Sequence, residues 1–217
     1  MKASPYVITI SRQLGSGGSY IGRNIAKRMG IYYLDREILR EVAQRLQVSE
    51  QALDKYDEKA ASFWQMIFPT EFIDTISYVP PKLFVPSAAN VFETQADIIN
   101  KVADERSAVI IGRGGHYILR NRPKHLSIFI HAGIPFRQKR IVDLYEVSEK
   151  QALKMIEQYD NERAKYIRQV SGLDWLNACN YQLCIDTGGM GIDNAVNMIV
   201  NYIKDQFGVR EIHPEMG

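Results

Sequence analysis

The sequence predicts an α/β fold, with a parallel sheet at its centre and helices on both faces of that sheet. Short runs of almost entirely apolar residues recur along the chain, as in Tyr6–Ile10 and Ala108–Ile111, and amphipathic helical patterns separate them. Strands that are buried on both faces have this continuous apolar character, which is typical of parallel sheets. The 217 residues are 46% hydrophobic and 24% charged, which excludes a disordered chain or a fibrous repeat.

The predicted core begins with the strand Tyr6–Ile10, and a glycine-rich loop follows it. An amphipathic helix comes next, and Gly30 is placed to end it. Apolar side chains recur in this helix at four-residue spacing, at Ile21, Ile25 and Met29. A short second strand is expected over residues 31–34, and another helix over residues 35–46.

Residues 48–105 have a different character. They contain no strand pattern, and their middle part is rich in aromatic residues and broken by prolines, from Phe63 to Pro86. Ser87 is placed to cap a further helix, whose apolar residues include Val91 and Ile98. We therefore expect a helical lobe that is inserted between two strands of the sheet.

Strand patterns return after this lobe. The expected strands cover residues 108–111, 126–130 and 183–185, and the expected helices cover residues 135–145, 149–170 and 193–207. Ser148 and Gln151 form a capping box at the start of the long second helix. Ligands of parallel α/β sheets bind at the carboxyl ends of the strands, so the loops that follow the strands are the candidate site.

The overall charge excludes some classes of partner. Lysine and arginine total 27 and aspartate and glutamate total 25, which gives a net charge of +2 and no reason to expect bulk nucleic-acid or membrane binding. No apolar run is long enough to cross a bilayer, and no signal peptide precedes the first strand. Cys179 and Cys184 can form neither a disulfide framework nor a four-ligand zinc site. We expect a soluble, cytoplasmic protein.

The loop after the first strand has the features of a phosphate-binding loop. It lies between a strand and a helix, where backbone N–H groups and the helix dipole attract anions. Compared with the P-loop pattern GxxxxGK[ST], Arg12 replaces the first glycine, Gly17 matches the second, Gly18 replaces the lysine and Ser19 matches the hydroxyl residue. The loop is therefore a degenerate P-loop, in which Arg12 is a chemically sensible substitute for the missing lysine. Its predicted phosphate-binding residues are Gly15, Ser16, Gly17, Gly18 and Ser19.

Two other interpretations of this loop remain open. Gly15 and Gly17 fit the start of the dinucleotide fingerprint GxGxxG, and Asp35 lies near the position of its ribose-binding acid, although Tyr20 occupies the third glycine position. The loop could also be a tight turn that binds no ligand.

Arginines are the remaining candidates for contact with an anionic ligand. Arg113 lies between glycines at the end of an apolar strand, where its side chain can reach a ligand phosphate or neutralise a nearby carboxylate. Arg137 and Arg140 share one face of a helix, and Arg163 lies on the next helix three residues after Asp160. Arginines from two helices can stabilise a transferring phosphoryl group, but ordinary surface ion pairs would produce the same pattern.

Taken in order along the chain, these motifs resemble the cytidylate kinase-like family of P-loop nucleoside monophosphate kinase folds. The resemblance spans residues 6 to about 205. Its motifs are Ile8-Thr9-Ile10-Ser11-Arg12 with Gly15-Ser16-Gly17-Gly18, Tyr33-Leu34-Asp35-Arg36-Glu37, Ile111-Gly112-Arg113-Gly114, Phe129-Ile130-His131-Ala132, Asp160-x-x-Arg163-Ala164 and Tyr181-x-Leu183-x-Ile185-Asp186-Thr187.

The resemblance implies a three-layer α/β/α sandwich that forms a single domain over residues 1–217. Its core would comprise residues 1–47, 106–136 and 171–208. Residues 48–105 would form the monophosphate-binding lobe, and residues 137–170 the lid with its flanking helices.

The resemblance also implies roles for individual residues. Asp35, with its neighbour Arg36, would serve the acceptor substrate, and Arg113 would bind the acceptor phosphate. Arg163 is the best match to a lid arginine that stabilises the transferring group. In the family the residue after the arginine of this segment is an aspartate, whereas this chain has Gly114 there.

The sequence thus leads to the hypothesis of an ATP-dependent phosphotransferase that acts on a nucleoside monophosphate or a similar small phosphate. ATP and Mg²⁺ would be its cofactors, with the Ser19 hydroxyl on the metal, and Arg12, Arg137, Arg140 and Arg163 its catalytic arginines. A nucleotide-binding regulator without kinase activity is the main alternative, because the P-loop lysine is missing. A nicotinamide-dependent oxidoreductase is a third. A homo-oligomer is compatible with the sequence.

Overall fold

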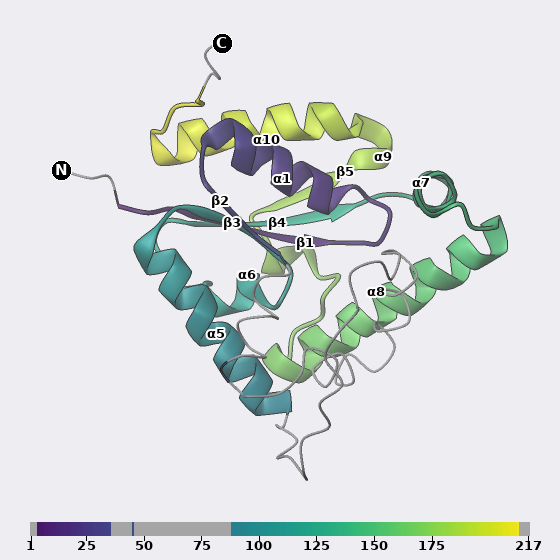
Figure 1. Cartoon of the computed structure of the whole chain (residues 1–217), viewed down its shortest axis with the longest axis horizontal. Helices are drawn as coiled ribbons and strands as arrows, with labels where there is room; N and C mark the ends of the chain where they lie inside the picture. The colour runs from purple at the N-terminus through teal and green to yellow at the C-terminus, as the bar shows by residue number, and fades with distance from the viewer. Residues whose placement is uncertain (1–3, 36–44, 46–87, 213–217) are drawn as a thin grey trace, which may run out of the picture. The chain divides into compact units, whose positions relative to one another are not determined.

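The fold is built on a parallel sheet with the strand order β2-β3-β1-β4-β5 (Figure 1). The computed structural model describes residues 4–35, 45 and 88–212. Within them, the strands are β1 (Val7–Arg12), β2 (Tyr32–Leu34), β3 (Ala108–Ile111), β4 (His125–His131) and β5 (Leu183–Asp186). Every neighbouring pair of these strands runs parallel, so the predicted α/β fold with a parallel sheet is confirmed.

Strand β1 is longer than the sequence predicted, and this positions the site. The prediction ended the strand at Ile10, but Ser11 and Arg12 also pair in register with Phe129 and Ile130 of β4. The apolar pattern stops at Ile10 because Ser11 and Arg12 have polar side chains, whereas their backbone continues the ladder. Arg12 is therefore held at the carboxyl edge of the sheet by backbone hydrogen bonds.

The described helices are arranged around this sheet. They are α1 (Gly18–Met29), α5 (Ala88–Glu105), α6 (Gly115–Ile118), α7 (Ile134–Tyr145), α8 (Glu149–Ser171), the 3-10 helix η1 (Ala178–Asn180), α9 (Thr187–Met190) and α10 (Ile192–Phe207). The predicted terminators are confirmed, since Gly30 and Gly208 adopt left-handed conformations as C-caps of α1 and α10. The predicted capping box of Ser148 and Gln151 is also confirmed.

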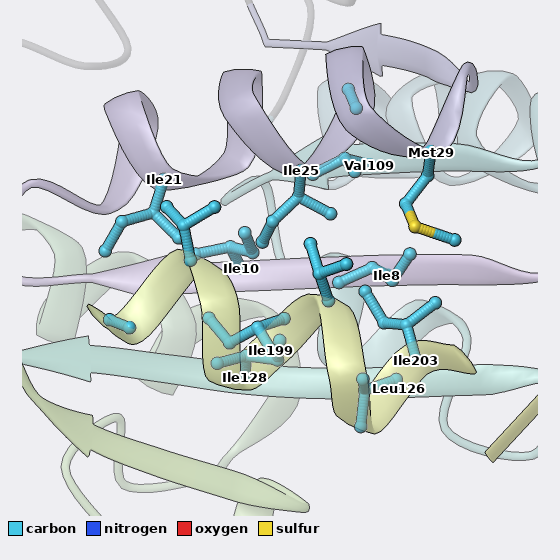
Figure 2. Packing of buried hydrophobic residues seen from close by; sticks show 14 of the residues in the cluster. Ile8, Ile10, Ile21, Ile25, Met29, Val109, Leu126, Ile128, Ile199 and Ile203 are labelled. Carbon is cyan, nitrogen blue, oxygen red and sulfur yellow. The ribbon is translucent and has the colours of Figure 1, made fainter. Parts of the chain in front are cut away.

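Helices α1 and α10 cover one face of the sheet with an apolar layer. Side chains of α1, α10, β1, β3 and β4 interdigitate there (Figure 2). The fully buried members include Ile8, Ile10, Ile21, Ile25, Ile128 and Ile199. Most of the buried members of this layer are aliphatic, so its packing supports the strands whose loops lie at the carboxyl edge.

Helices α6 and α8 lie on the opposite face (Figure 1). An aromatic cluster connects α8 to the sheet there, in which Phe129 of β4 packs against Trp175 and Tyr181, with ring centroids 5.4 Å and 5.0 Å apart. Ile167 of α8 belongs to the same cluster. This packing holds α8, which carries Asp160 and Arg163, against β4, the strand that pairs with β1.

The chain divides into two compact units, residues 1–35 with 99–217, and residues 36–98. Helix α5 begins in the second unit and continues into the first. The predicted helix over residues 35–46, the aromatic stretch from Phe63 and the predicted cap Ser87 lie outside the described residues, apart from Asp35 and Arg45. In the part of the chain that the structure describes, no helix is both long and apolar enough to span a membrane.

The apolar layer is expected to dominate the stability of the first unit. Ile128 lies in a central strand with 0% of its surface exposed, so Ile128→Ala should lower the free energy of unfolding by about 2–5 kcal/mol. Chemical denaturation followed by circular dichroism measures this change. Leu144→Ala is the matched control, because Leu144 is 58% exposed and its truncation should change stability by less than about 0.5 kcal/mol. Equal losses in both variants would contradict this account of the core.

Candidate active site at the carboxyl edge of the sheet

The loop between β1 and α1 is fastened to the neighbouring strand. The Gln13 backbone N–H donates to the Ile130 carbonyl oxygen at 3.0 Å, and the Gln13 side-chain oxygen accepts from the Ala132 N–H at 3.3 Å. Gly15 and Gly17 have φ values of 80° and 85°, a conformation that residues with a Cβ atom rarely adopt. The glycines predicted from the P-loop pattern are therefore required by the backbone itself.

The loop leads directly into the N-terminus of α1. Gly17 is the N-cap residue, no described side chain caps the helix, and the first turn contains no acidic residue. The backbone N–H groups of this turn and the positive end of the helix dipole point towards the loop. An anion bound by Gly15–Ser19 would accept hydrogen bonds from these N–H groups and lie at the positive end of the helix dipole, as in other strand–loop–helix phosphate sites.

The side chain of Arg12 occupies the space where a P-loop carries its lysine. A Cβ atom added to Gly18 would overlap Cβ of Arg12, so the stem of Arg12 fills the position of any side chain at residue 18. The guanidinium continues towards the ends of two other strands. It lies against Gly112, where an added Cβ atom would overlap Nη1, and 3.9 Å from the Asp35 carboxylate. The side chain of Arg12 and a lysine side chain at residue 18 would therefore exclude each other sterically.

Asp160 of α8 joins three parts of the site through one carboxylate. Its Oδ1 accepts a hydrogen bond from the Leu14 N–H in the phosphate loop at 2.9 Å and lies 3.6 Å from Nη1 of Arg163. Its Oδ2 forms an ion pair with Nη1 of Arg137 at 2.5 Å. The same Arg137 nitrogen donates to the Leu14 carbonyl oxygen at 3.3 Å. The loop, α7 and α8 are thereby held in one arrangement.

Arg163 and Arg137 face the loop in different ways. Nη1 of Arg163 donates to the Arg12 carbonyl oxygen at 3.0 Å, which places Arg163 beside the base of the phosphate loop. Arg137 is buried, with 4% of its surface exposed, and its guanidinium contacts Leu14 and Asp160. Its backbone also packs on Gly15, where an added Cβ atom would lie 2.8 Å from the Arg137 carbonyl oxygen.

The segment after β3 adopts an uncommon backbone conformation. Gly112, Arg113 and Gly114 have φ values of 68°, 55° and 67°, three consecutive residues in the left-handed region. For Arg113 this conformation costs about 1 kcal/mol or more, and strained non-glycine residues concentrate at functional sites. The glycine-flanked arginine predicted from sequence thus lies in a specially shaped loop at the carboxyl edge.

Arg12, Arg113 and Arg163 influence one another electrostatically at this edge. Burial lowers the pKa of Arg163 to about 9, and the positive charges of Arg12 and Arg113 add to the effect, whereas the Asp160 and Asp35 carboxylates oppose it. The pKa of Arg12 is also lowered, first by burial and then by Arg113, against the opposing charge of Asp35. The three guanidinium groups form a cation-rich cluster that an anionic ligand would stabilise.

Tyr33 connects Asp35 to the phosphate loop. Its hydroxyl donates to Oδ2 of Asp35 at 3.1 Å, and the hydroxyl oxygen lies 3.3 Å from the Ser19 carbonyl oxygen. Burial and the neighbouring Asp35 raise the pKa of Tyr33, so the phenol stays protonated at neutral pH. Asp35 is thus placed between Arg12 and Tyr33, while Arg36 lies outside the described residues.

The structure brings most of the remaining predicted residues to the same edge. Ser16 is buried, and its hydroxyl donates to the Gln13 carbonyl oxygen at 2.8 Å. Ser19 lies in the first turn of α1. Arg140 is one turn after Arg137 on α7 and half-buried, with its guanidinium carbon 6.0 Å from the centre of the Phe136 ring.

Two residues of the site had no role in the sequence analysis. Asp160 was noted only for its spacing to Arg163, and nothing in the local pattern reveals that it reaches Leu14. Thr187 was noted only as the end of a family motif, but its buried hydroxyl lies 2.8 Å from the Ser16 carbonyl oxygen and 3.1 Å from that of His131. Thr187, the first residue of α9 (Thr187–Met190), therefore supports the phosphate loop from the end of β5, and only the strand order could have predicted it.

With this geometry established, comparison with known proteins identifies the family. A family model described as "Cytidylate kinase-like family" matches residues 7–189. The chain belongs to this family. The match includes the phosphate loop, Asp35, Arg113, Asp160, Arg163 and Thr187, and it confirms the resemblance derived from the sequence motifs.

Solved structures agree on the fold. An uncharacterized protein from Eubacterium ventriosum ATCC 27560 is 26% identical, with a TM-score of 0.68 and coverage of 92% of this chain and 98% of the other. A gluconokinase from Sinorhizobium meliloti 1021 (12% identity, TM-score 0.54, coverage 95% and 96%) and a shikimate kinase from Bacteroides thetaiotaomicron (12%, 0.51, 92% and 98%) share the P-loop kinase fold. Among curated proteins, no sequence matches.

Asp160 should be essential for the stability of this arrangement. Asp160→Ala leaves the buried Arg137 guanidinium without its counter-charge, so the free energy of unfolding should fall by about 3–5 kcal/mol. Urea denaturation measures the loss. Asp143→Ala on α7 is the control, because Asp143 is exposed and its removal should cost less than about 0.5 kcal/mol. If Asp160→Ala were as stable as the control, the ion pair would not hold the loop.

Proposed function

We propose that this member of the cytidylate kinase-like family is an ATP-dependent phosphotransferase. It transfers the γ-phosphoryl group of ATP to a nucleoside monophosphate or a similar small phosphate acceptor. The observation that carries the proposal is the cation-rich cluster of Arg12, Arg113 and Arg163 beside a strand–loop–helix phosphate loop. Phosphoryl transfer depends on positive charge around the reacting group, and this cluster would supply that charge to both the donor and the acceptor phosphates.

The donor phosphates would be held by Gly15–Ser19. The backbone N–H groups at the start of α1 are the donors, and the left-handed glycines let the chain curve around the anion. The residues also fit a magnesium ion bound together with the donor, because Ser19 supplies a hydroxyl in the first turn of α1 and Mg²⁺ in such sites relies mostly on phosphates and water. When bound, the ion would neutralise charge on the phosphate oxygens.

Arg12 would perform the electrostatic work of the P-loop lysine. Its stem fills the space above Gly18, and its charge lies between the phosphate loop, Gly112 and Asp35. From this position the guanidinium can contact the transferring group on its acceptor side. An arginine keeps its charge at any physiological pH and binds phosphate oxygens with two parallel N–H groups.

The acceptor would be bound at the ends of β2 and β3. Arg113 is held there by the left-handed loop and supplies a cation for the acceptor phosphate, and Asp35 supplies a hydrogen-bond acceptor for the rest of the substrate. Arg36 is proposed to act with Asp35 on the family resemblance alone. An acceptor with an anionic phosphate needs no general base, since its oxygen is already deprotonated.

In the proposed reaction, an oxygen of the acceptor phosphate forms a bond to the γ-phosphorus as the bond to the β,γ-bridging oxygen breaks. ADP leaves, and the acceptor gains one phosphoryl group. Arg163 and Arg140 would stabilise the negative charge on the transferring group, and Arg137 would keep the loop in place through Leu14 and Asp160. In-line positioning and charge stabilisation supply the rate acceleration.

The kinase activity can be tested with a coupled assay of ADP release across nucleoside monophosphates, with Mg²⁺ present. We expect at least one acceptor to raise turnover well above ATP hydrolysis, with a phosphorylated product detected by mass spectrometry. Arg163→Ala should lower kcat/KM about 100-fold or more, because the lost charge acts on the transition state. Arg168→Ala is the matched control, since Arg168 is exposed on the same helix and should retain activity.

Two outcomes would contradict the proposal. If ATP binds by calorimetry but no acceptor is phosphorylated, the chain is a nucleotide-binding regulator. If ATP does not bind and the nicotinamide dinucleotide NAD does, the loop is a dinucleotide site.

The exchange of Arg12 and Gly18 offers a sharper test. The double variant Arg12→Gly with Gly18→Lys restores the full GxxxxGK[ST] pattern and should retain ATP binding within about tenfold of the wild-type affinity. Gly18→Lys alone should disrupt the loop, because the new side chain overlaps Arg12, and Arg12→Gly alone should weaken ATP binding about 10- to 100-fold. Isothermal titration calorimetry measures all four proteins. If the double variant binds no better than either single variant, Arg12 does not replace the lysine.

A further inference from the structure

A second cavity lies on the α6 side of the sheet, away from the phosphate loop. It has a volume of about 330 Å³, within the range of small-molecule sites. Its described lining residues come from α6, the start of β4 and the segment before β5: His116, Tyr117, Arg120, His125, Ser127, Leu173, Cys179, Asn180, Tyr181 and Gln182. None of these residues belongs to the site described above.

The cavity is separated from the phosphate loop by most of a strand. The lining residues His125 and Ser127 of β4 precede Ile130, where the loop is fastened, by five and three residues, which corresponds to roughly 10–16 Å along a strand. A ligand bound here would therefore occupy a separate site and would not be an extension of the donor or acceptor phosphates.

His116 is the feature that points to a ligand. It is 4% exposed, and neither ring nitrogen has a hydrogen-bond partner among the residues that the structure describes. Burial lowers the pKa of His116 to about 4, so the imidazole is neutral and offers one N–H donor and one nitrogen acceptor. Buried polar atoms in folded proteins are nearly always hydrogen-bonded to protein, water or ligand, so this ring is a place in the cavity wall where a ligand can find a hydrogen-bond partner.

The other polar groups of the wall are held by the protein. Nε2 of His125 lies 2.8 Å from the Thr9 hydroxyl oxygen, and the Gln182 side-chain oxygen accepts from the Ser127 N–H at 2.6 Å. The Tyr181 hydroxyl donates to the Trp175 carbonyl oxygen at 2.9 Å. The wall is therefore preorganised, and a ligand would meet fixed groups at little cost in ordering.

The chemistry of the lining selects the class of ligand. Arg120 is the charged residue among the described lining residues, and its guanidinium already lies 4.0 Å from the centre of the Tyr117 ring and donates to the Tyr117 carbonyl oxygen. The described residues contain no group of three metal-ligating side chains. Aromatic walls with a neutral donor and acceptor suit an uncharged planar heterocycle, which presents complementary groups on its edge.

We infer that this cavity is a second binding site, for an uncharged heterocyclic ligand of the nucleoside class. His116 would form hydrogen bonds with the polar edge of the ligand's ring. The site lies on a different part of the fold from the phosphate loop and does not depend on the proposed kinase activity.

Titration of the full-length protein with adenosine, guanosine, cytidine and uridine tests the inference, because these probes carry no phosphate. We expect at least one nucleoside to bind with one site per chain. His116→Phe should weaken binding at least tenfold, while it keeps the fold and leaves ATP binding unchanged. Arg12→Ala should leave nucleoside binding within twofold and weaken ATP binding.

Arg120→Ala provides a second variant that does not alter the buried core, since Arg120 is exposed, and it should weaken nucleoside binding several-fold. The inference is overturned if no nucleoside binds to the wild-type protein at millimolar concentration, which would mean that water satisfies His116. It is also overturned if binding is lost in Arg12→Ala and unchanged in His116→Phe and Arg120→Ala, since the nucleoside would then occupy the phosphate-loop site.

Discussion

The partly buried carboxylate of Asp160 is the constraint on which the candidate active site depends. It contacts the Leu14 N–H, Arg137 and Arg163, which belong to three segments that are far apart in the sequence. Removing such a charge from water is costly unless its partners are in place, so the loop, α7 and α8 must adopt their arrangement together. The aromatic cluster around Phe129 fixes the same helix to β4. The position of Arg163 therefore depends on the packing of α8 against the sheet.

A steric constraint bears on the missing lysine of the phosphate loop. A side chain at residue 18 and the stem of Arg12 compete for one space, so the chain can keep either cation but not both. The arginine brings its charge from β1, and the guanidinium therefore lies nearer to Asp35 and Gly112 than a lysine on α1 would. In the proposed reaction this shifts positive charge from the donor side of the transferring group to the acceptor side. In this proposal Gly18 replaces the lysine of the motif, and Arg12 of β1 supplies the cation in its place.

The sequence predicted the features that depend on local pattern. The strands, the helix terminators Gly30 and Gly208 and the capping box at Ser148 follow from hydrophobic periodicity and backbone preference, so a single segment is enough to reveal them. Features that depend on strand order were missed. The contact of Asp160 with Leu14 spans 146 residues, and the support of Ser16 by Thr187 spans 171. Such contacts exist only after β1, β4 and β5 are assembled side by side.

The two faces of the sheet differ in a way that bears on function. The face under α1 and α10 is dominated by aliphatic side chains, as stability alone would favour (Figure 2). The opposite face buries the polar residues Thr9, Ser127, His125 and His116. Burying them costs a desolvation free energy that apolar residues at the same positions would not cost. Helix α6, which carries His116, begins immediately after the left-handed loop that carries Arg113. One short segment thus contributes to both candidate sites, and a ligand bound at His116 would contact the helix that follows the Arg113 loop directly.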